Sequence, residues 1–335
     1  MHDSRLIKRP NDGPLRGGRI DELGIASRNS ALSRLYDIEF CQMGAGDLKV
    51  EIEYVASGRS VLYRELYDSN THAMGTLRDG LFGFSIPLLD RESVWWGHRL
   101  GSDMLATAIG GESIDIMFRP GFRHLVAIIP HDSLLRAISR TRMDASVARS
   151  VSTGRCGNLL RADPQALERL GDQLQRLLDQ PDDAPPRRAA RAFDDLLLGA
   201  VLSLLDSGRQ RVESARMSSA LFRRAIEVYD SMPEPPNVTA LCLALRTSPR
   251  TLEAAFSACA GMGPHRFFML RRLNRANALL CRAEPEPGTV TRIASELGFT
   301  ELGRFAVRYR QLFGESPSQT LAAIPRRIFQ LPLPR

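Results

Sequence analysis

Polar and apolar residues alternate along several stretches of the first 130 residues. In residues 47–55, DLKVEIEYV, the apolar side chains share one face of an extended chain: Leu48, Val50, Ile52 and Tyr54. A period of two residues is typical of a half-buried β-strand. Five similar stretches follow, separated by Gly, Asp, Ser or Pro: residues 60–66, 80–87, 103–109, 113–118 and 124–130. We expect an antiparallel barrel or sandwich over residues 31–140, after an irregular segment over residues 1–30.

The period changes to that of helices over residues 141–214. Leu167, Leu170, Leu174 and Leu177 are spaced three or four residues apart, which places them on one helix face. Asp163 suits the N-cap of this helix and Pro164 suits its first turn. A second, very apolar helix is expected over residues 190–208. The two helices either pack on the sheet or pair between two subunits, and the sequence favours neither outcome.

The C-terminal part of the chain contains a repeat. Leu252, Phe256, Gly261 and Pro264 recur 53 residues later as Phe305, Tyr309, Gly314 and Pro317. Each set follows a short helical stretch, VTALCLAL at 238–245 or VTRIASEL at 290–297, and a tight turn. This order predicts two helix-turn-helix units, one at about 238–259 and one at about 290–313.

Each unit carries signals for the ends of its second helix. Ser248 and Thr300 are suited to cap the N-termini, and Pro249 fits a first helical position. Gly261 and Gly314 suit the C-termini. The spacing predicts that these apolar side chains are buried: Leu252, Ala255, Phe256 and Cys259 in the first unit, and Leu302, Phe305, Ala306, Tyr309, Leu312 and Phe313 in the second.

A third helix is expected between the units, over residues 264–283, with Phe268, Leu273, Ala276 and Leu280 on one side. At about 1.5 Å per residue it would be roughly 25–30 Å long. Two helices joined by such a rod suit adjacent major grooves on one face of DNA, which lie about 34 Å apart.

Charge is unevenly distributed along the chain. The net charge is +7, and from Arg216 onward 17 arginines face 9 acidic residues. A basic C-terminal part suits nucleic acid or an anionic membrane surface, although it also suits an ordinary solvated surface. Only 2 of the 45 basic residues are lysines; this bias is not evidence of a particular chemistry.

The residues on the solvent side of each second helix are the candidates for contact with DNA. In the first unit these are Arg250, Thr251, Glu253, Ala254 and Ser257; in the second they are Glu301, Gly303, Arg304, Val307 and Arg308. Arginine contacts guanine or clamps phosphate, and Glu301 either accepts from cytosine or favours the helix N-terminus. Arg266, Arg271, Arg272 and Arg275 on the middle helix either contact phosphates or form ion pairs within the protein.

Catalytic and metal-binding motifs are absent from the sequence. The histidines stand alone, and the chain has neither a GxSxG motif nor a CxxC pair. We therefore expect no enzyme activity, no metal and no cofactor. Phe82, Phe84, Trp95 and Trp96 either fill a core or line a ligand pocket, with the two tryptophans on opposite faces of any strand. Five scattered cysteines and the lack of an apolar leader favour the cytoplasm and give no sign of a membrane protein.

At these residues the sequence resembles the AraC/XylS family of bacterial transcription regulators. The resemblance covers about residues 218–322 and rests on SPRTLEAAF, GMGPHRFFMLRRLNRA, IASELGF and FGESPS. It implies a DNA-binding domain, residues 215–323, that binds promoter DNA near RNA polymerase. Carried over by position, Ser248, Arg250, Thr251 and Glu253 belong to the first DNA contact, and Thr300, Glu301, Gly303, Arg304, Val307 and Arg308 to the second. Val307 departs from the family, which often has a polar or basic residue there.

More loosely, GLFGFSIP, GSDMLATAIGGESIDIMF and VAIIPHDSLL are similar to regulators of the ethanolamine-utilisation type. This similarity implies a cupin-like effector domain over residues 31–140, then a helical linker over 141–214 that is a candidate for homodimer contact, and a tail over 324–335. The predicted function is an effector-responsive transcription activator located at the nucleoid. The alternatives are a cupin-like enzyme tethered to DNA, which would need a metal or a reactive thiol such as Cys41, and a DNA-binding regulator without a ligand.

Overall fold

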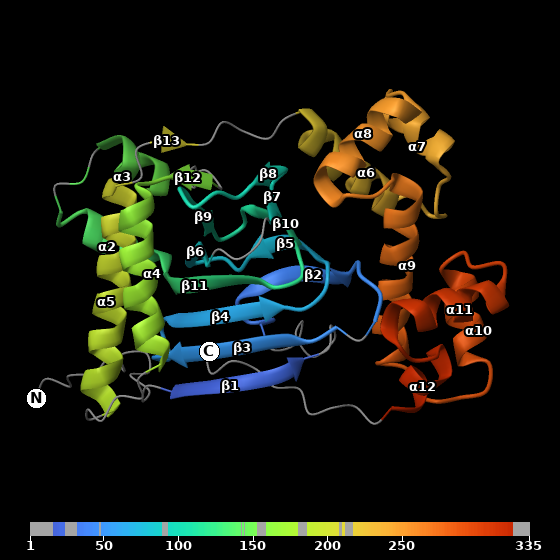
Figure 1. Ribbon diagram of the computed structural model, residues 1–335, viewed down its shortest axis with the longest axis horizontal. Coiled ribbons are helices and arrows are strands. Elements are labelled where there is room, and N and C mark those ends of the chain that lie inside the picture. The colour runs from blue at the N-terminus through green and yellow to red at the C-terminus, as the bar shows by residue number, and fades with distance from the viewer. Residues whose placement is uncertain are drawn as a thin grey trace, which may run out of the picture.

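A computed structural model describes residues 16–23, 32–46, 48–88, 93–141, 143, 145–152, 159–179, 186–207, 210–211 and 217–323. Long helices, a sheet-rich middle and a second group of helices lie side by side (Figure 1). The described part therefore has the expected α+β organisation, an antiparallel β-region followed by a helical C-terminal region. The predicted tail over 324–335 lies outside the described residues.

The strands form two antiparallel sheets. Eight strands follow the order β1-β3-β4-β11-β6-β9-β12-β13, and five follow the order β2-β5-β10-β7-β8. Their bounds are β1 Arg16–Leu23, β2 Tyr36–Gln42, β3 Val50–Ala56, β4 Val61–Tyr67, β5 Thr71–Leu77, β6 Leu81–Leu88, β7 Val94–Trp95, β8 His98–Arg99, β9 Met104–Ile109, β10 Ser113–Phe118, β11 Phe122–Pro130, β12 Leu159–Arg161 and β13 Gln210–Arg211.

The inner faces of the two sheets enclose one hydrophobic core. Val50 and Ile52 of β3 lie in this core with Phe40 of β2 and Ile116 of β10. Val55, which is at an odd spacing from Val50, lies instead in a second core on the other side of β3. The alternation in residues 47–55 therefore correctly predicts a strand with two different faces.

The second core lies between the eight-stranded sheet and four helices. These are α2 His131–Ile138, α3 Ala145–Ser152, α4 Pro164–Asp179 and α5 Pro186–Ser207. Leu167 and Leu174 of α4 and Leu197 of α5 are buried there. Asp163 caps α4, since its Oδ2 accepts from the amide of Ala166 at 3.2 Å. Both helices thus pack on the sheet. Within the described ranges, no helix combines the length and apolar character that crossing a membrane requires.

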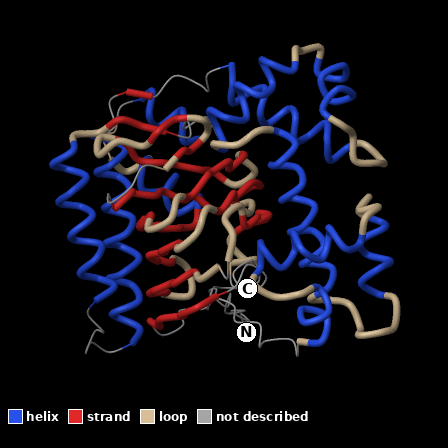
Figure 2. Tube along the Cα trace, turned by 45° about the vertical axis from the view of Figure 1, so that its right-hand side comes forward, coloured by secondary structure: helices blue, strands red, loops and turns tan. Residues whose placement is uncertain are grey.

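The third core lies between the outer face of the five-stranded sheet and the C-terminal helices (Figure 2). These helices are α6 Met217–Ser231, α7 Val238–Leu245, α8 Pro249–Ala260, α9 Pro264–Leu280, α10 Thr289–Glu296, α11 Leu302–Phe313 and α12 Pro317–Ala322. Cys41 of β2 and Met117 of β10 are buried against Phe222, Phe256 and Phe267. The two parts of the chain therefore share a core.

Two expectations for the N-terminal part are wrong. Residues 1–30 are not irregular throughout, because β1 pairs with β3 from Arg16 to Leu23. Its sequence, RGGRIDEL, shows little alternation, so only the partner strand reveals it. Trp95 and Trp96 do not point to opposite environments; both are buried. Trp96 has a φ of 46° and forms the tight turn between β7 and β8 with Gly97, which brings its ring back onto the inner core.

Candidate nucleic-acid interface

Helix α8 displays the candidate residues of the first helix-turn-helix unit. It begins as predicted, with the Ser248 side chain accepting from the Thr251 amide at 3.1 Å and Pro249 in the first turn. Leu252 and Phe256 are fully buried, which turns Arg250, Thr251 and Glu253 toward solvent. The carboxylate of Glu253 lies against the backbone of Gly263, at the start of α9.

Helix α11 displays the candidates of the second unit. Phe305 and Tyr309 are buried, while Gly303, Arg304, Val307 and Arg308 are exposed. Arg304 and Arg308 lie one turn apart on the same side. Arg304 Nη1 donates to Glu301 Oε1 at 2.9 Å, and both side chains are mostly exposed.

The start of α11 differs from the prediction. The N-cap is Glu301, whose side chain makes no capping bond, and Thr300 precedes it as an exposed residue. Leu302 was expected in the core but is 40% exposed. Since the helix begins one residue later than predicted, Leu302 occupies its first turn, at the edge of the packed face.

Helix α9 separates the two units. Its 17 residues correspond to about 26 Å, and α8 and α11 lie toward its opposite ends (Figure 1). Phe268, Leu273, Ala276 and Leu280 are buried as predicted. Tyr309 fixes α11 to this helix, because its hydroxyl accepts from Asn277 at 2.7 Å and donates to Thr320 of α12 at 2.9 Å. Burial raises the pKa of Tyr309, so the phenol stays protonated in this network.

Two of the four arginines of α9 are engaged inside the protein. Arg271 is 7% exposed and pairs with Glu39 at 2.8 Å and Asp230 at 2.9 Å. Arg272 lies over the ring of Phe299, and its Nη1 contacts the carbonyls of Leu297 and Gly298. The prediction of a phosphate contact is therefore wrong for Arg271, because β2 covers its face of α9. Arg272 binds the backbone carbonyls of the turn between α10 and α11 in the second unit. Arg266 and Arg275 are exposed.

The N-terminal part contains a cavity of about 60 Å³ between its two sheets. Phe84, Trp95 and Trp96 are among its lining residues, whereas Phe82 is not. Phe82 is buried in the core beneath the helices, because its strand has a helix-covered face and a cavity face. Phe84 belongs to the same helix-covered core, although it also borders the cavity.

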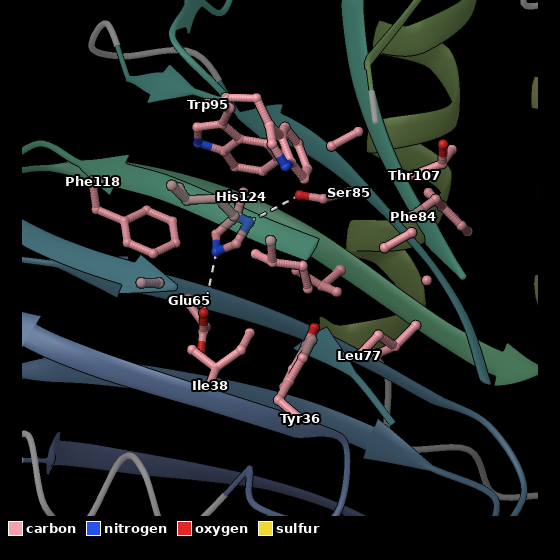
Figure 3. A pocket seen from close by; sticks show the side chains of 18 of the residues that line it. Tyr36, Ile38, Glu65, Leu77, Phe84, Ser85, Trp95, Thr107, Phe118 and His124 are labelled. Atoms are coloured by element: carbon pink, nitrogen blue, oxygen red, sulfur yellow. Dashed lines mark hydrogen bonds and ion pairs between the residues drawn. The ribbon is translucent and has the colours of Figure 1, made fainter. Parts of the chain in front are cut away.

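A chain of polar side chains lines one wall of the cavity (Figure 3). His124 Nδ1 lies 2.9 Å from Ser85 Oγ, and His124 Nε2 lies 3.1 Å from Glu65 Oε2. Glu65 also accepts from the hydroxyl of Tyr67 at 3.0 Å. The hydroxyls of Tyr36 on β2 and Tyr63 on β4 lie 2.5 Å apart, so this pair connects the two sheets across the cavity. Sequence reasoning missed these groups, because the three members of the chain come from β4, β6 and β11 with no common spacing.

The surroundings of Cys41 disfavour the thiolate form that a catalytic cysteine needs. Cys41 is buried at the boundary between the five-stranded sheet and the C-terminal helices, and burial together with Glu39 raises the pKa of its thiol. A nucleophilic cysteine needs the opposite shift. Among the described residues, no group of three or more His, Cys, Asp or Glu side chains could hold a metal ion.

Residues 241–323 match a family model described as a helix-turn-helix domain. The chain is 34% identical over 162 residues to the "Probable thc operon regulatory protein" of Rhodococcus erythropolis, covering 47% of this chain and 49% of that protein. It is 28% identical over 142 residues to a "XylDLEGF operon transcriptional activator" of Pseudomonas putida, covering 42% of this chain and 44% of that protein. The chain thus spans about half the length of the curated relatives it matches.

Solved structures give a weaker likeness. A transcriptional regulator with an AraC-type DNA-binding domain, from Chromobacterium violaceum, is 25% identical with a TM-score of 0.29 and covers 32% of this chain and 93% of that chain. The AraC-like transcriptional activator CuxR is 13% identical with a TM-score of 0.36. The likeness covers 78% of this chain and 95% of the CuxR chain. Scores this low do not establish a common overall arrangement. The family match agrees with the two units on α9: residues 241–323 are a helix-turn-helix domain, and the chain is similar to curated operon regulators.

Proposed function

We propose that the protein is an effector-responsive transcription activator that binds two adjacent major grooves of promoter DNA through α8 and α11. The observation that carries the proposal is the display of two polar helix faces by two helix-turn-helix units joined through one helix of about 26 Å. In this proposal the partners are double-stranded DNA, RNA polymerase and a second copy of the chain. The place of action is the cytoplasmic nucleoid.

The exposed residues of the two helices have distinct roles in the proposal. Arg304 and Arg308 contact guanine edges, and Val307 between them contacts a thymine methyl group. The ion pair of Arg304 with Glu301 does not withhold the arginine from DNA, because an exposed pair is typically worth less than about 1 kcal/mol. Arg250, Thr251 and Glu253 contact the other groove. Ser248 and Thr300 lie at the helix starts, and Arg266 and Arg275 contact phosphates.

The effector in this proposal binds in the cavity between the sheets. The volume of about 60 Å³ is well below the roughly 150 Å³ that accommodates benzene, so the cavity suits a compact molecule. Among its lining residues that the structure describes, Glu65 and His124 are the ionisable groups besides the tyrosines, and none is a lysine or arginine. An uncharged or cationic ligand therefore fits, whereas a carboxylate would bring a second negative charge beside Glu65 with no lysine or arginine in the lining to balance it. Catalysis has no part in this proposal.

The purified full chain is expected to protect two neighbouring segments of a promoter, about one helical turn apart, in a footprinting experiment. With about five arginines at phosphates or bases, affinity should fall roughly 10²–10³-fold between 50 and 200 mM salt. The upstream region of the gene beside this one is the first probe, and a random duplex is the control. Equal affinity for both duplexes would refute the proposed function.

Substitution of Arg304 or Arg308 with Ala is expected to weaken specific binding by about 1–3 kcal/mol and to relax the preference at one base pair. Arg310→Ala is the matched control, because Arg310 is exposed on another side of α11. Competition binding to point-substituted duplexes measures both effects. A uniform loss on all duplexes, with a salt slope lower by about one, would instead assign the arginine to phosphate.

Replacing Gly303 with Ala tests how closely α11 approaches DNA. The added methyl group meets no atom within 4 Å, and alanine is favoured over glycine in a helix by up to about 1 kcal/mol. The free protein should therefore unfold at a higher temperature, while DNA binding weakens about tenfold, or about 1.4 kcal/mol. Gly199→Ala in α5, which is equally open, should stabilise without changing DNA binding. Unchanged DNA affinity of the Gly303 variant would exclude close approach there.

Thermal shift tests the cavity, with alcohols, amines and carboxylic acids of two to four carbons as probes. A member of the first two classes should raise the unfolding temperature, since a ligand at 100 times its Kd stabilises by about 2.7 kcal/mol. Ala73→Val adds two methyl groups at the cavity wall and should abolish the shift. Thr76→Val on the same strand, outside the cavity lining, should retain it. A shift with the acids alone would contradict the assigned ligand class.

A further inference from the structure

The end of strand β2 is bound by a side chain of the C-terminal domain. β2 is an edge strand, paired with β5 on one side. On its other side the amide of Gln42 donates to Asn274 Oδ1 at 2.8 Å, and Asn274 Nδ2 donates to the carbonyl of Gln42 at 2.8 Å. The Asn274 side chain thus occupies the place of a neighbouring strand and satisfies both backbone groups of Gln42. This contact joins the β-sheet part of the chain directly to α9.

The side chain of Gln42 also contacts the second helix-turn-helix unit. Gln42 Nε2 donates to the carbonyl of Leu312 at 2.7 Å, and the amide of Gly46 donates to the carbonyl of Gln311 at 3.3 Å. Both acceptors belong to the last turn of α11, whose carbonyls lack partners within the helix. The C-terminus of this candidate recognition helix is therefore capped by residues that lie 265–270 positions earlier in the chain.

An ion-pair cluster adds a third contact at β2. Arg271 of α9 pairs with Glu39 of β2 and with Asp230 of α6, although the arginine itself is almost fully buried. Glu39 and Asp230 remain partly exposed. A buried guanidinium needs such partners, because removing one leaves a charge that is poorly compensated. The cluster links β2 to α6, the helix that packs on α8 of the first unit.

The rest of the five-stranded sheet packs on α6 and the start of α9, which flank the first unit. The imidazole of His72 on β5 makes edge contacts with the rings of Phe222 and Phe267 at 5.8 and 5.3 Å between centroids. A side chain at Gly97 would collide with Ser219 of α6. The sheet therefore contacts α6, which packs on α8 of the first unit, and also the last turn of α11 in the second unit.

We propose that this sheet fixes the angle between α8 and α11, and that Gln42 and Asn274 are the positioning residues that set which spacing of DNA half-sites the protein accepts. We call the contacts of Glu39, Gln42 and Gly46 with α9 and α11 the β2 brace. The proposal rests on the proposed function as a DNA-binding regulator. In this proposal the five-stranded sheet influences which DNA sequences are bound, whether or not a ligand occupies the cavity.

The geometry of DNA explains why an angle becomes a spacing preference. Inserting one base pair moves a half-site by about 3.4 Å and turns it by about 35° around the duplex axis. If the two units were joined only through the ends of α9, each unit could rotate at its end of α9 and so adapt to the altered position of its half-site. With the β2 brace in place, a rotation of α11 relative to α9 must break the bonds of Gln42 to Asn274 or its bond to Leu312.

The experiment uses the full chain and a duplex that the wild-type protein selects from a randomised library. The spacing between the two protected half-sites is then changed by −1, +1 and +2 base pairs, and affinity is measured for each duplex. The wild-type protein should lose at least about tenfold at every altered spacing, in the range of a mismatched contact. Gln42→Met keeps the side-chain length but removes the amide donors, and its loss should shrink to about threefold or less.

Two further variants make the result decisive. Glu39→Gln removes the charge that pairs with Arg271, at a side chain that is partly exposed. This variant replaces Gln42→Met in the experiment if thermal unfolding shows that Gln42→Met does not fold. Asp37→Asn, on an exposed position of β2, is the control and should keep the wild-type spacing preference. Equal spacing losses for the wild-type, Gln42→Met and Glu39→Gln proteins would overturn the β2 brace while leaving DNA binding intact. Failure of the wild-type protein to select any sequence would refute the proposed function and the brace with it.

Discussion

Burial of the five-stranded sheet on both faces is the constraint on which the rest of the structure depends. Along β2, Tyr36, Ile38 and Phe40 border the cavity, while Cys41 and the residues after it pack on the C-terminal helices. A strand has only two faces, so β2 contacts the cavity with one face and the helix-turn-helix domain with the other. Gln42 is only two residues after Phe40, which borders the cavity. Any change in the cavity that moves the backbone of β2 at Phe40 therefore also moves Gln42.

The buried polar groups explain how one arrangement of the two parts is selected. Apolar packing alone is non-directional, but the Arg271 cluster and the Asn274 amide each require particular partners across the boundary between β2 and α9. Sliding the sheet across α9 would leave these groups buried and unsatisfied, which is unfavourable by about 1–3 kcal/mol for each neutral group. The interface is therefore specified by its hydrogen bonds and stabilised by its aromatic rings.

Local spacing was enough to predict the two helix-turn-helix units, apart from the start of α11, because most helix ends and buried positions are encoded within about twenty residues. Ser248, Gly261 and Gly314 cap their helices as the sequence indicates. Long-range features could not be predicted. Arg271 and Arg272 are adjacent and chemically identical in the sequence, yet one is buried because β2, over 200 residues earlier, covers its side of α9. The polar chain at His124 likewise exists only once three separate strands are paired.

The arginines of the C-terminal domain are thus divided by packing into two groups. Arg271 and Arg272 hold elements of the protein together, whereas Arg304 and Arg308 extend from α11 beside Val307, which is 58% exposed. A single exposed valine is common on protein surfaces and by itself indicates nothing. Its position between two arginines on a helix whose other side is buried is different, because a base pair presents a methyl group beside hydrogen-bonding atoms only in the major groove. The side chains displayed on α11 match that combination, while the net charge of the domain would suit any polyanion.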